Sequence, residues 1–479
     1  MNVRVLRGCV LVAIAMSGLA AAQERPDRSR PPSPGLPAAL DLPAIQKLSL
    51  TNGLGVWVVE RHEVPIVQVS LIVRAGAGLD PAGKFGAATL TAAMLDEGAG
   101  ARSALDIADV AEFLGASLTT TASFDAAAVR LNVPVEHLPE ALPLLADVAL
   151  RPAFPDKELE RLRQERLTLL LQARDEPSSL AGMAFSRLVF GPAHRYGTGT
   201  IGTNASLKSL SAADLRGFHS AHYEPSGATV LVVGDTTAAA IVPLLQRAFG
   251  DWRRAPSPRP DPPAPVPPPR GEVVIVDTPG AEQSQIRIGT VGVSRSAPDY
   301  FPLLVLNTIL GGSFTSRLNQ NLREEHGYTY GASSAFDMRR SAGPFVAAAG
   351  VQTDKTADAL REFFTELNGI RQPVGAEELA KAKNYVALAF PGEFETTTDL
   401  SRRLEELVAY GLPDDYFERY VPNVTAVTAA AVQRAAAQHL QPSRFTVVVV
   451  GDRKAIEPGI RALKLGPVRA VAVTEALGE

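Results

Sequence analysis

The pattern of apolar and polar positions divides the first half of the chain into groups of strands and groups of helices. Apolar residues flank Asn52-Gly53, which predicts a β-hairpin, and Ile66 to Val73 is a run of strand-forming residues. The same pattern predicts a helix over 83–97, a helix capped by Ser103 and ending at Gly115, strands near 117–122 and 127–133, helices over 136–149 and 155–173, and a strand over Val230–Val233.

The second half of the chain repeats the first. The strand run 227–235 reappears as 444–452, and the segment 222–226 reappears as 439–443. Both pairs are separated by 217 residues (451 − 234 and 439 − 222), which predicts two copies of one domain. Because strands and helices are grouped without strict βαβ alternation, the predicted fold class is α+β. Each of the two tandem domains should have a mostly antiparallel sheet backed by helices.

Proline content marks the boundary between the two copies. Pro256 to Pro269 is dominated by proline and should be extended and semi-rigid. We therefore expect an N-terminal domain over 44–252, a linker over 253–271 and a C-terminal domain over 272–479.

The N-terminus has the pattern of a processing segment. Two arginines precede an apolar run from Cys9 to Leu19, and small residues follow at Ala20–Ala22. This predicts a signal peptide over 1–22, a flexible leader over 23–43 and a periplasmic protein. The alternative is that the apolar segment is retained as a membrane anchor.

Composition excludes some classes of function. Hydrophobic residues make up 46% of the chain and charged residues 20%, which is typical of a globular protein. The net charge is −4 and there is no basic stripe, so nucleic acid is not an expected partner. The single cysteine, Cys9, lies in the expected signal peptide, and the mature chain should contain no disulfide.

One stretch in the second half predicts a short helix that leads directly into a strand. Ser313 or Ser316 can cap the helix, and Leu318 and Leu322 share one of its faces. Gly327 is a natural C-terminal residue for such a helix, so the strand should start just after it.

Two side chains of this stretch could act together. Arg323 lies in the last helical turn, and Tyr328 and Tyr330 alternate in the strand, so the two tyrosines should share one face. A guanidinium from Arg323 and a hydroxyl from Tyr330 could grip and polarise a peptide carbonyl. The structural alternative is that Arg323 complements the helix dipole and that Tyr330 is a strand former.

The sequence of this stretch resembles a known signature. The segments Gly-Gly-Ser-Phe-x-Ser-Arg-Leu (311–318), Leu-Arg-Glu (322–324) and Gly-Tyr-x-Tyr (327–330) are similar to the second-domain motif of insulinase/pitrilysin-type peptidases, which are inverted-motif zincins. The resemblance covers nearly the whole mature chain. It implies that Arg323 and Tyr330 contact the substrate backbone, and that the two domains form half of a clamshell.

The zinc motif of that family is degenerate here. Its first domain carries H-x-x-E-H on a helix, with two zinc-binding histidines and a glutamate base. In this chain the aligned ligand positions are Thr89 and Ala93, and the base position is Ala92. A downstream glutamate ligand aligns with Leu169-Leu170. We therefore expect this chain to hold no metal and to have no catalytic residue of its own.

No other residues offer a replacement site. Of the seven histidines only His219 and His222 have helical ligand spacing, and they belong to a packing motif that repeats at His439 without a second histidine. Structural histidines are the favoured interpretation. There is no Ser–His–Asp set with a nucleophile elbow and no phosphate-binding loop.

The resemblance implies a non-catalytic subunit of a heterodimeric zinc metalloendopeptidase that acts on peptides or unfolded segments. A homologous partner would carry H-x-x-E-H and the zinc, while this chain would supply Arg323 and Tyr330 and be inactive alone. The alternative is a periplasmic peptide-binding or scaffold protein with no enzymatic role. An independent enzyme has least support, since no acid–base constellation is visible. The sequence names neither partner nor substrate and leaves a homodimer open.

Overall fold

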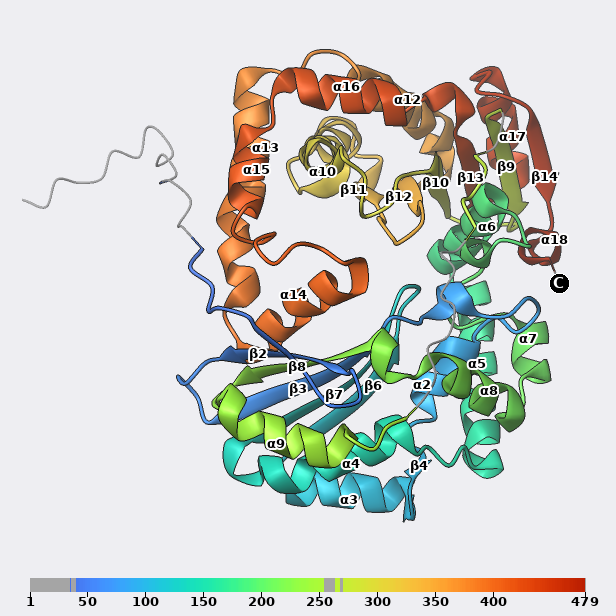
Figure 1. The fold of residues 1–479 in the computed structure, drawn as a ribbon. Coiled ribbons are helices and arrows are strands. Elements are labelled where there is room, and N and C mark those ends of the chain that lie inside the picture. The colour runs from blue at the N-terminus through green and yellow to red at the C-terminus, as the bar shows by residue number, and fades with distance from the viewer. Residues whose placement is uncertain (1–34, 36–39, 254–262, 268–269, 479) are drawn as a thin grey trace, which may run out of the picture. The chain divides into compact units, whose positions relative to one another are not determined.

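Two six-stranded sheets organise the chain (Figure 1), whose computed structural model describes residue 35 and residues 40–253, 263–267 and 270–478. The strand order of the first sheet is β1 (Gln46–Ser49), β2 (Gly55–Glu60), β8 (Ala228–Gly234), β3 (Ile66–Val73), β7 (Ala127–Pro134) and β6 (Ser117–Ala122). The second sheet, taken from its C-terminal edge strand, is β14 (Val468–Val471), β9 (Glu272–Asp277), β13 (Thr446–Gly451), β10 (Gln283–Val291), β12 (Pro344–Gln352) and β11 (Thr329–Phe336).

The two sheets share one topology except at one edge. β2, β8, β3, β7 and β6 occupy the same places as β9, β13, β10, β12 and β11. Most pairings are antiparallel, and the parallel ones are β2–β8, β9–β13 and β9–β14. At the edge next to β2 lies the antiparallel N-terminal strand β1, whereas the edge next to β9 is filled by β14 from the end of the chain. The predicted internal repeat is thus visible as a repeated sheet.

Helices follow the strands in both halves. Those of the first half are α2 (Ala87–Ala93), α3 (Ala104–Phe113), α4 (Leu138–Leu150), α5 (Asp156–Asp175), α6 (Pro177–Phe190), α7 (Asn204–Ser209), α8 (Ala212–His222) and α9 (Ala238–Phe249). Those of the second half are α10 (Tyr300–Asn307), α11 (Arg317–Asn319), α12 (Thr356–Gly369), α13 (Ala376–Ala389), α14 (Thr397–Tyr410), α15 (Tyr420–Ala426), α16 (Ala429–His439), α17 (Arg453–Ala462) and α18 (Val473–Leu477). None of these described helices has the length and apolarity needed to cross a membrane.

Each sheet takes one covering helix from the other half of the chain. α14 packs on β3 and β8 of the first sheet, opposite the face that α4 and α9 cover, and α6 packs on β10 and β13 of the second (Figure 1). The strands are therefore apolar on both faces. In β13, Val448 and Val450 pack with α6, while Val447 and Val449 face the core on the other side. Because of this exchange, the described residues from 40 to 478 form one compact unit.

Most of the predicted elements are present, with one clear difference. β1 and β2 pair as the expected hairpin, and Ser103 caps α3 with a reciprocal capping box. The helix predicted over 83–97, however, is only α2, Ala87–Ala93. Gly86 precedes it with φ +94°, a left-handed conformation that cannot continue a helix backward. The Ala-rich pattern therefore overestimated its length.

Some predictions concern residues that the structure does not describe. The expected signal peptide over 1–22 lies outside the described residues, as do most of the leader over 23–43 and much of the linker over 253–271.

Candidate functional site

The degenerate zinc-motif positions come together between α2 and α5. Thr89 and Ala93 on α2 and Leu169 on α5 line one hollow of about 270 Å³, together with Leu162, Glu165, Arg166, Thr200 and Ile201. Ala92, at the position of the catalytic base, is buried and does not line it. The sequence alignment therefore identified three positions that share one site in the fold.

An aspartate positions the start of α2 at this hollow. The Asp80 carboxylate accepts hydrogen bonds of 2.7 Å from the backbone N–H groups of Gly86 and Ala88. Arg195 pairs with the same carboxylate at 2.8 Å, and both side chains are buried. Burial raises the pKa of Asp80 against the opposing effect of Arg195. The pair fixes where the first turn of α2 begins.

An arginine lines the hollow beside the aligned zinc-ligand positions. Nη1 of Arg166 donates to Oγ1 of Thr89 at 2.9 Å, and Nη2 donates to the carbonyl oxygen of Thr89 at 2.8 Å. Burial lowers the pKa of Arg166 to about 10, so the guanidinium is still charged at neutral pH. Sequence reasoning missed this residue, although Arg166 lies one helical turn before Leu169 and therefore on the same face of α5.

The residues around this hollow do not fit a zinc ion. Ala93 and Leu169 offer only hydrocarbon. The hydroxyl of Thr89 donates to the carbonyl oxygen of Thr200 at 2.8 Å and accepts from Arg166. A guanidinium beside the ligand positions also opposes a second cation. Among the described residues, no cluster of three or more His, Cys, Asp or Glu has a metal-binding arrangement.

Of the two histidines with helical spacing, His219 makes contacts that are typical of a structural residue. Its Nε2 is 2.9 Å from the carbonyl oxygen of Ala149, and its ring stacks on Tyr223. His439, the repeat-related histidine, pairs with Asp299 at 2.9 Å. These contacts agree with the structural interpretation of both residues.

The helix that carries Arg323 ends in a π-helical segment. α11 continues into η6 (Gln320–Glu325), whose last turn is closed by the bond from the His326 N–H to the carbonyl oxygen of Asn321. Gly327 then adopts φ +65°, as expected for the residue after a helix end. Ser316 is the N-terminal cap residue, but its side chain makes no capping hydrogen bond. π-helical turns are frequent at functional sites.

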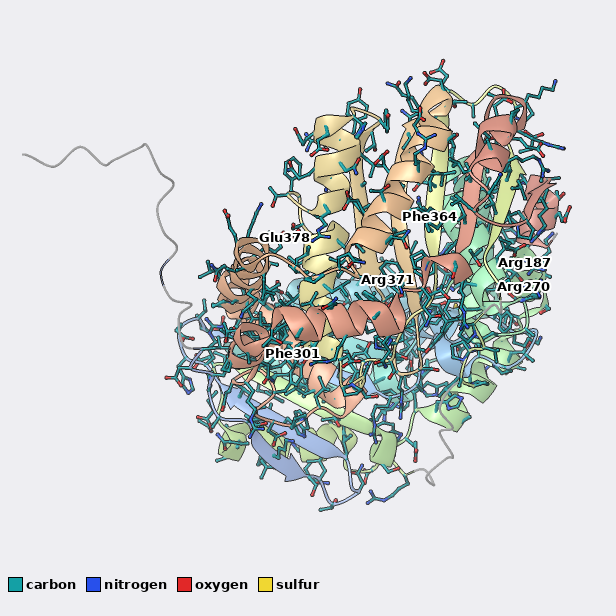
Figure 2. All side chains as sticks on the ribbon, turned by 90° about the horizontal axis from the view of Figure 1, so that it is seen from above. Arg187, Arg270, Phe301, Phe364, Arg371 and Glu378 are labelled. Carbon is teal, nitrogen blue, oxygen red and sulfur yellow. The ribbon has the colours of Figure 1, made fainter. Side chains whose placement is uncertain are left out.

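Polar side chains hold this helix from several sides. Arg317 makes two bonds of 2.7 Å to Glu378 on α13, a residue labelled in Figure 2. Asn319 Oδ1 accepts a bond of 2.9 Å from the Ala332 N–H on β11. Asn321 donates to Glu366 on α12 at 2.8 Å. Because these three residues face the protein, the helix position is fixed around Arg323.

Tyr330 projects from a bulge in β11. The pairing of β11 with β12 shifts its register between Thr329 and Ala332. The Thr329 hydroxyl holds the bulge by donating to the carbonyl oxygen of Gly350 at 2.7 Å. Tyr330 is 94% exposed, whereas Tyr328 packs partly buried against the core. The prediction that the two tyrosines share one face is therefore wrong, because a bulge breaks the two-residue alternation.

Arg323 contacts an aromatic ring next to the same helix. Its Cζ lies 4.4 Å from the ring centroid of Phe314, which is 65% exposed. Its Nη1 is 3.5 Å from a carboxylate oxygen of Glu324. Within the described residues, no hydrogen bond or ring contact joins Arg323 to Tyr330. Phe314 belongs to the sequence motif, but its stacking on Arg323 was not predicted.

Comparisons with known proteins match both halves of the chain to one family. A family model described as Insulinase (Peptidase family M16) matches residues 56–186, and one described as Peptidase M16 inactive domain matches residues 209–386. An "Uncharacterized zinc protease" of Mycobacterium leprae is 30% identical over 315 residues, 64% of this chain and 69% of that protein. A protein of the same description from Mycobacterium tuberculosis is 27% identical over 440 residues, covering 90% and 99%.

Solved structures give the same result. The structure of a peptidase M16 inactive domain from Pseudomonas fluorescens matches with a TM-score of 0.80 and 26% identity, covering 85% of this chain and 98% of that one. A protease from Helicobacter pylori has the same fold, with a TM-score of 0.78, 21% identity and coverage of 86% and 100%. The sequence motifs, the repeated sheet and these matches lead to one conclusion: the chain belongs to the insulinase family, peptidase family M16.

Proposed function

We propose that this chain is the zinc-less subunit of a heterodimeric zinc metalloendopeptidase that acts on peptides or unfolded segments. A homologous partner with H-x-x-E-H holds the zinc and the catalytic base. This chain supplies Arg323, which orients the substrate backbone, and Tyr330, which donates a hydrogen bond to the scissile carbonyl oxygen.

The observation that carries the proposal is the contrast between the two halves of the chain. In the first half, Thr89, Ala93 and Leu169 leave no metal ligand set, and Arg166 adds a positive charge beside them. In the second half, Tyr330 is almost fully exposed on a bulge that Thr329 holds in place. A peptidase reaction needs an activated water as well as charge stabilisation, so a second polypeptide must provide the metal.

Arg323 is suited to backbone recognition. Its guanidinium is planar and offers several donors in one plane, which matches carbonyl groups better than an ammonium does. Stacking on Phe314 restricts the guanidinium without using its donors. Pre-orientation of this kind lowers the entropy lost when a substrate binds.

The second candidate function is a peptide-binding or scaffold protein with no enzymatic role. Two exposed aromatic side chains of the motif, Phe314 and Tyr330, are compatible with such binding. It differs from the first proposal because it requires neither a metal-bearing partner nor a change in reaction rate.

We further propose that the protein works in the periplasm after removal of residues 1–22. The pattern of basic, apolar and small residues up to Ala22 supports this. N-terminal sequencing of the protein after its export in a Gram-negative host should identify Gln23 as the first residue. A mature chain that begins at Met1 would contradict the periplasmic assignment.

Co-expression tests the main proposal. A secreted homologue with H-x-x-E-H encoded beside this chain should co-purify with it, and the pair should cleave an unfolded peptide that neither chain cleaves alone. Replacing the glutamate of the partner motif should abolish cleavage and preserve assembly. If the partner cleaves at the same rate with and without this chain, the scaffold function stands instead.

A further inference from the structure

The guanidinium of Arg166 has unused binding capacity. Its two bonds to Thr89 occupy two of the five N–H donors of an arginine. No other described residue accepts from it, and no described carboxylate lies within ion-pair distance. The side chain is only partly buried, so a ligand can reach the donors that Thr89 leaves free, and a carboxylate is the usual partner of such a guanidinium.

The surroundings of Arg166 combine one charge with apolar walls. Ala93, Leu162 and Leu169 line the same hollow of about 270 Å³, and Leu169 is 46% exposed at its rim. Leu171, two residues further along α5, is 56% exposed. Such a hollow can hold one small apolar side chain together with a charged group, and the exposed leucines can pack against the rest of a ligand.

The two carboxylates nearest to Arg166 are next to other arginines, so Arg166 can still pair with an anionic ligand. Glu165 lines the hollow as well, but its side chain is 58% exposed and its carboxylate lies 3.7 Å from Nη1 of Arg161. Asp80, the other acid that acts on Arg166, is already paired with Arg195. Neither acid therefore neutralises Arg166 at contact distance.

We propose that the hollow between α2 and α5 binds the free C-terminal carboxylate of a peptide whose last residue is apolar. The carboxylate accepts hydrogen bonds from the free donors of Arg166. The last side chain packs against Ala93, Leu162 and Leu169. This site is independent of the proposed role of Arg323 and Tyr330 and needs no partner subunit.

Peptide binding to the isolated mature chain tests this inference. The probe is a fluorescently labelled six-residue peptide ending in leucine, prepared with a free carboxylate and with a C-terminal amide. Fluorescence anisotropy should show that the free acid binds at least about tenfold more tightly, as expected for a charge-assisted pair. Equal binding of the two forms, or binding of neither, would overturn the inference.

Two variants locate the effect at the hollow. Arg166→Gln should abolish the preference for the free acid, while Arg402→Gln, which removes the same charge from an exposed position on α14, should preserve it. Leu169→Glu places a carboxylate at the rim and should also abolish it. Because Leu169 is half exposed, Leu169→Glu should fold even if Arg166→Gln does not. A free-acid preference that survives in folded Arg166→Gln would overturn the assignment.

The outcome is distinguishable from a failure of the proposed function. If the free-acid preference is absent but the assembled complex depends on Tyr330, only the carboxylate site is wrong. If Arg166→Gln lowers the melting temperature while the wild-type chain binds both peptides equally, Arg166 is only a brace between α2 and α5.

Discussion

Arg130 on β7 and Glu405 on α14 form a bidentate ion pair between the first sheet and the helix from the second half that covers it. Nε and Nη2 of Arg130 donate to the two carboxylate oxygens at 2.7 and 2.6 Å. The side chains are 27% and 13% exposed, so water screens the pair only partly. This pair connects a strand of the first sheet to a helix from the second half of the chain.

Breaking this pair should weaken the whole compact unit. Arg130→Met or Glu405→Gln should each lower the free energy of unfolding by roughly 1.5–3 kcal/mol, because each leaves a partly buried partner unpaired. The double variant should lose less than the sum of the two. Urea denaturation measures this. The exposed Arg402 on α14, which pairs with Asp399, is the control, and Arg402→Met should cost below about 1 kcal/mol. Equal costs for both pairs would contradict the role given to Arg130.

Asp125 should make stability depend on pH. This buried carboxylate accepts hydrogen bonds from the Tyr410 hydroxyl at 3.1 Å and from the Arg340 N–H at 3.2 Å. Burial raises the pKa of Asp125 above its ordinary value of 3.8, so the folded state holds the proton more tightly than the unfolded chain. The contribution to stability is therefore full below pH 3.8 and is lost as pH rises through the higher folded value.

Asp125→Asn removes this titration. The variant should flatten the fall in unfolding free energy between pH 3.8 and neutral pH, and it should be at least as stable as the wild type at pH 7. Urea midpoints across this range give the comparison. Asp106 is a control with the opposite shift, because its bonds to Ser103 lower its pKa. Asp106→Asn should therefore lower the unfolding free energy at neutral pH. A steeper pH dependence in Asp125→Asn would show that the assignment is wrong.

Tyr330→Phe should separate catalysis from folding. The side chain is 94% exposed, so removing its hydroxyl should leave the melting temperature and partner binding unchanged. Loss of one donor to a developing oxyanion typically lowers turnover about a hundredfold or more. Cleavage of a peptide by the assembled complex is the measurement, with Tyr385→Phe on α13, also exposed, as the control. An unchanged rate in a fully assembled complex would exclude the catalytic role.

Removing Arg166 should strengthen zinc binding by a variant in which the metal ligands are restored. The variant Thr89→His, Ala93→His and Leu169→Glu rebuilds a two-histidine, one-carboxylate set, yet the neighbouring guanidinium opposes a divalent cation. Adding Arg166→Gln should strengthen zinc binding at least about tenfold. Isothermal titration with zinc compares the two variants. Equal affinities would mean that Arg166 moves out of the hollow when the ligands are present.

The sequence by itself determined the family, the repeated fold and the approximate elements. The internal offset of 217 residues is reproduced by β2 and β9, which start at Gly55 and Glu272. Strand and turn signals act locally, so Ile66 to Val73 and the capping box at Ser103 were predictable. Helical spacing alone puts Thr89 and Ala93 on one face of α2, and it was the family resemblance that placed Leu169 with them at one site.

Tertiary structure alone decided features that depend on contacts distant in sequence. α14 covers the first sheet and α6 covers the second. The amphipathic pattern of each helix predicts a buried face but does not indicate which sheet that face packs against. The bulge that exposes Tyr330 depends on a hydrogen bond from Thr329 to Gly350, which lies on another strand. Arg166 contacts Thr89, 77 residues away in sequence. Such contacts form only after folding, because the energy of each depends on a partner that the local sequence does not contain.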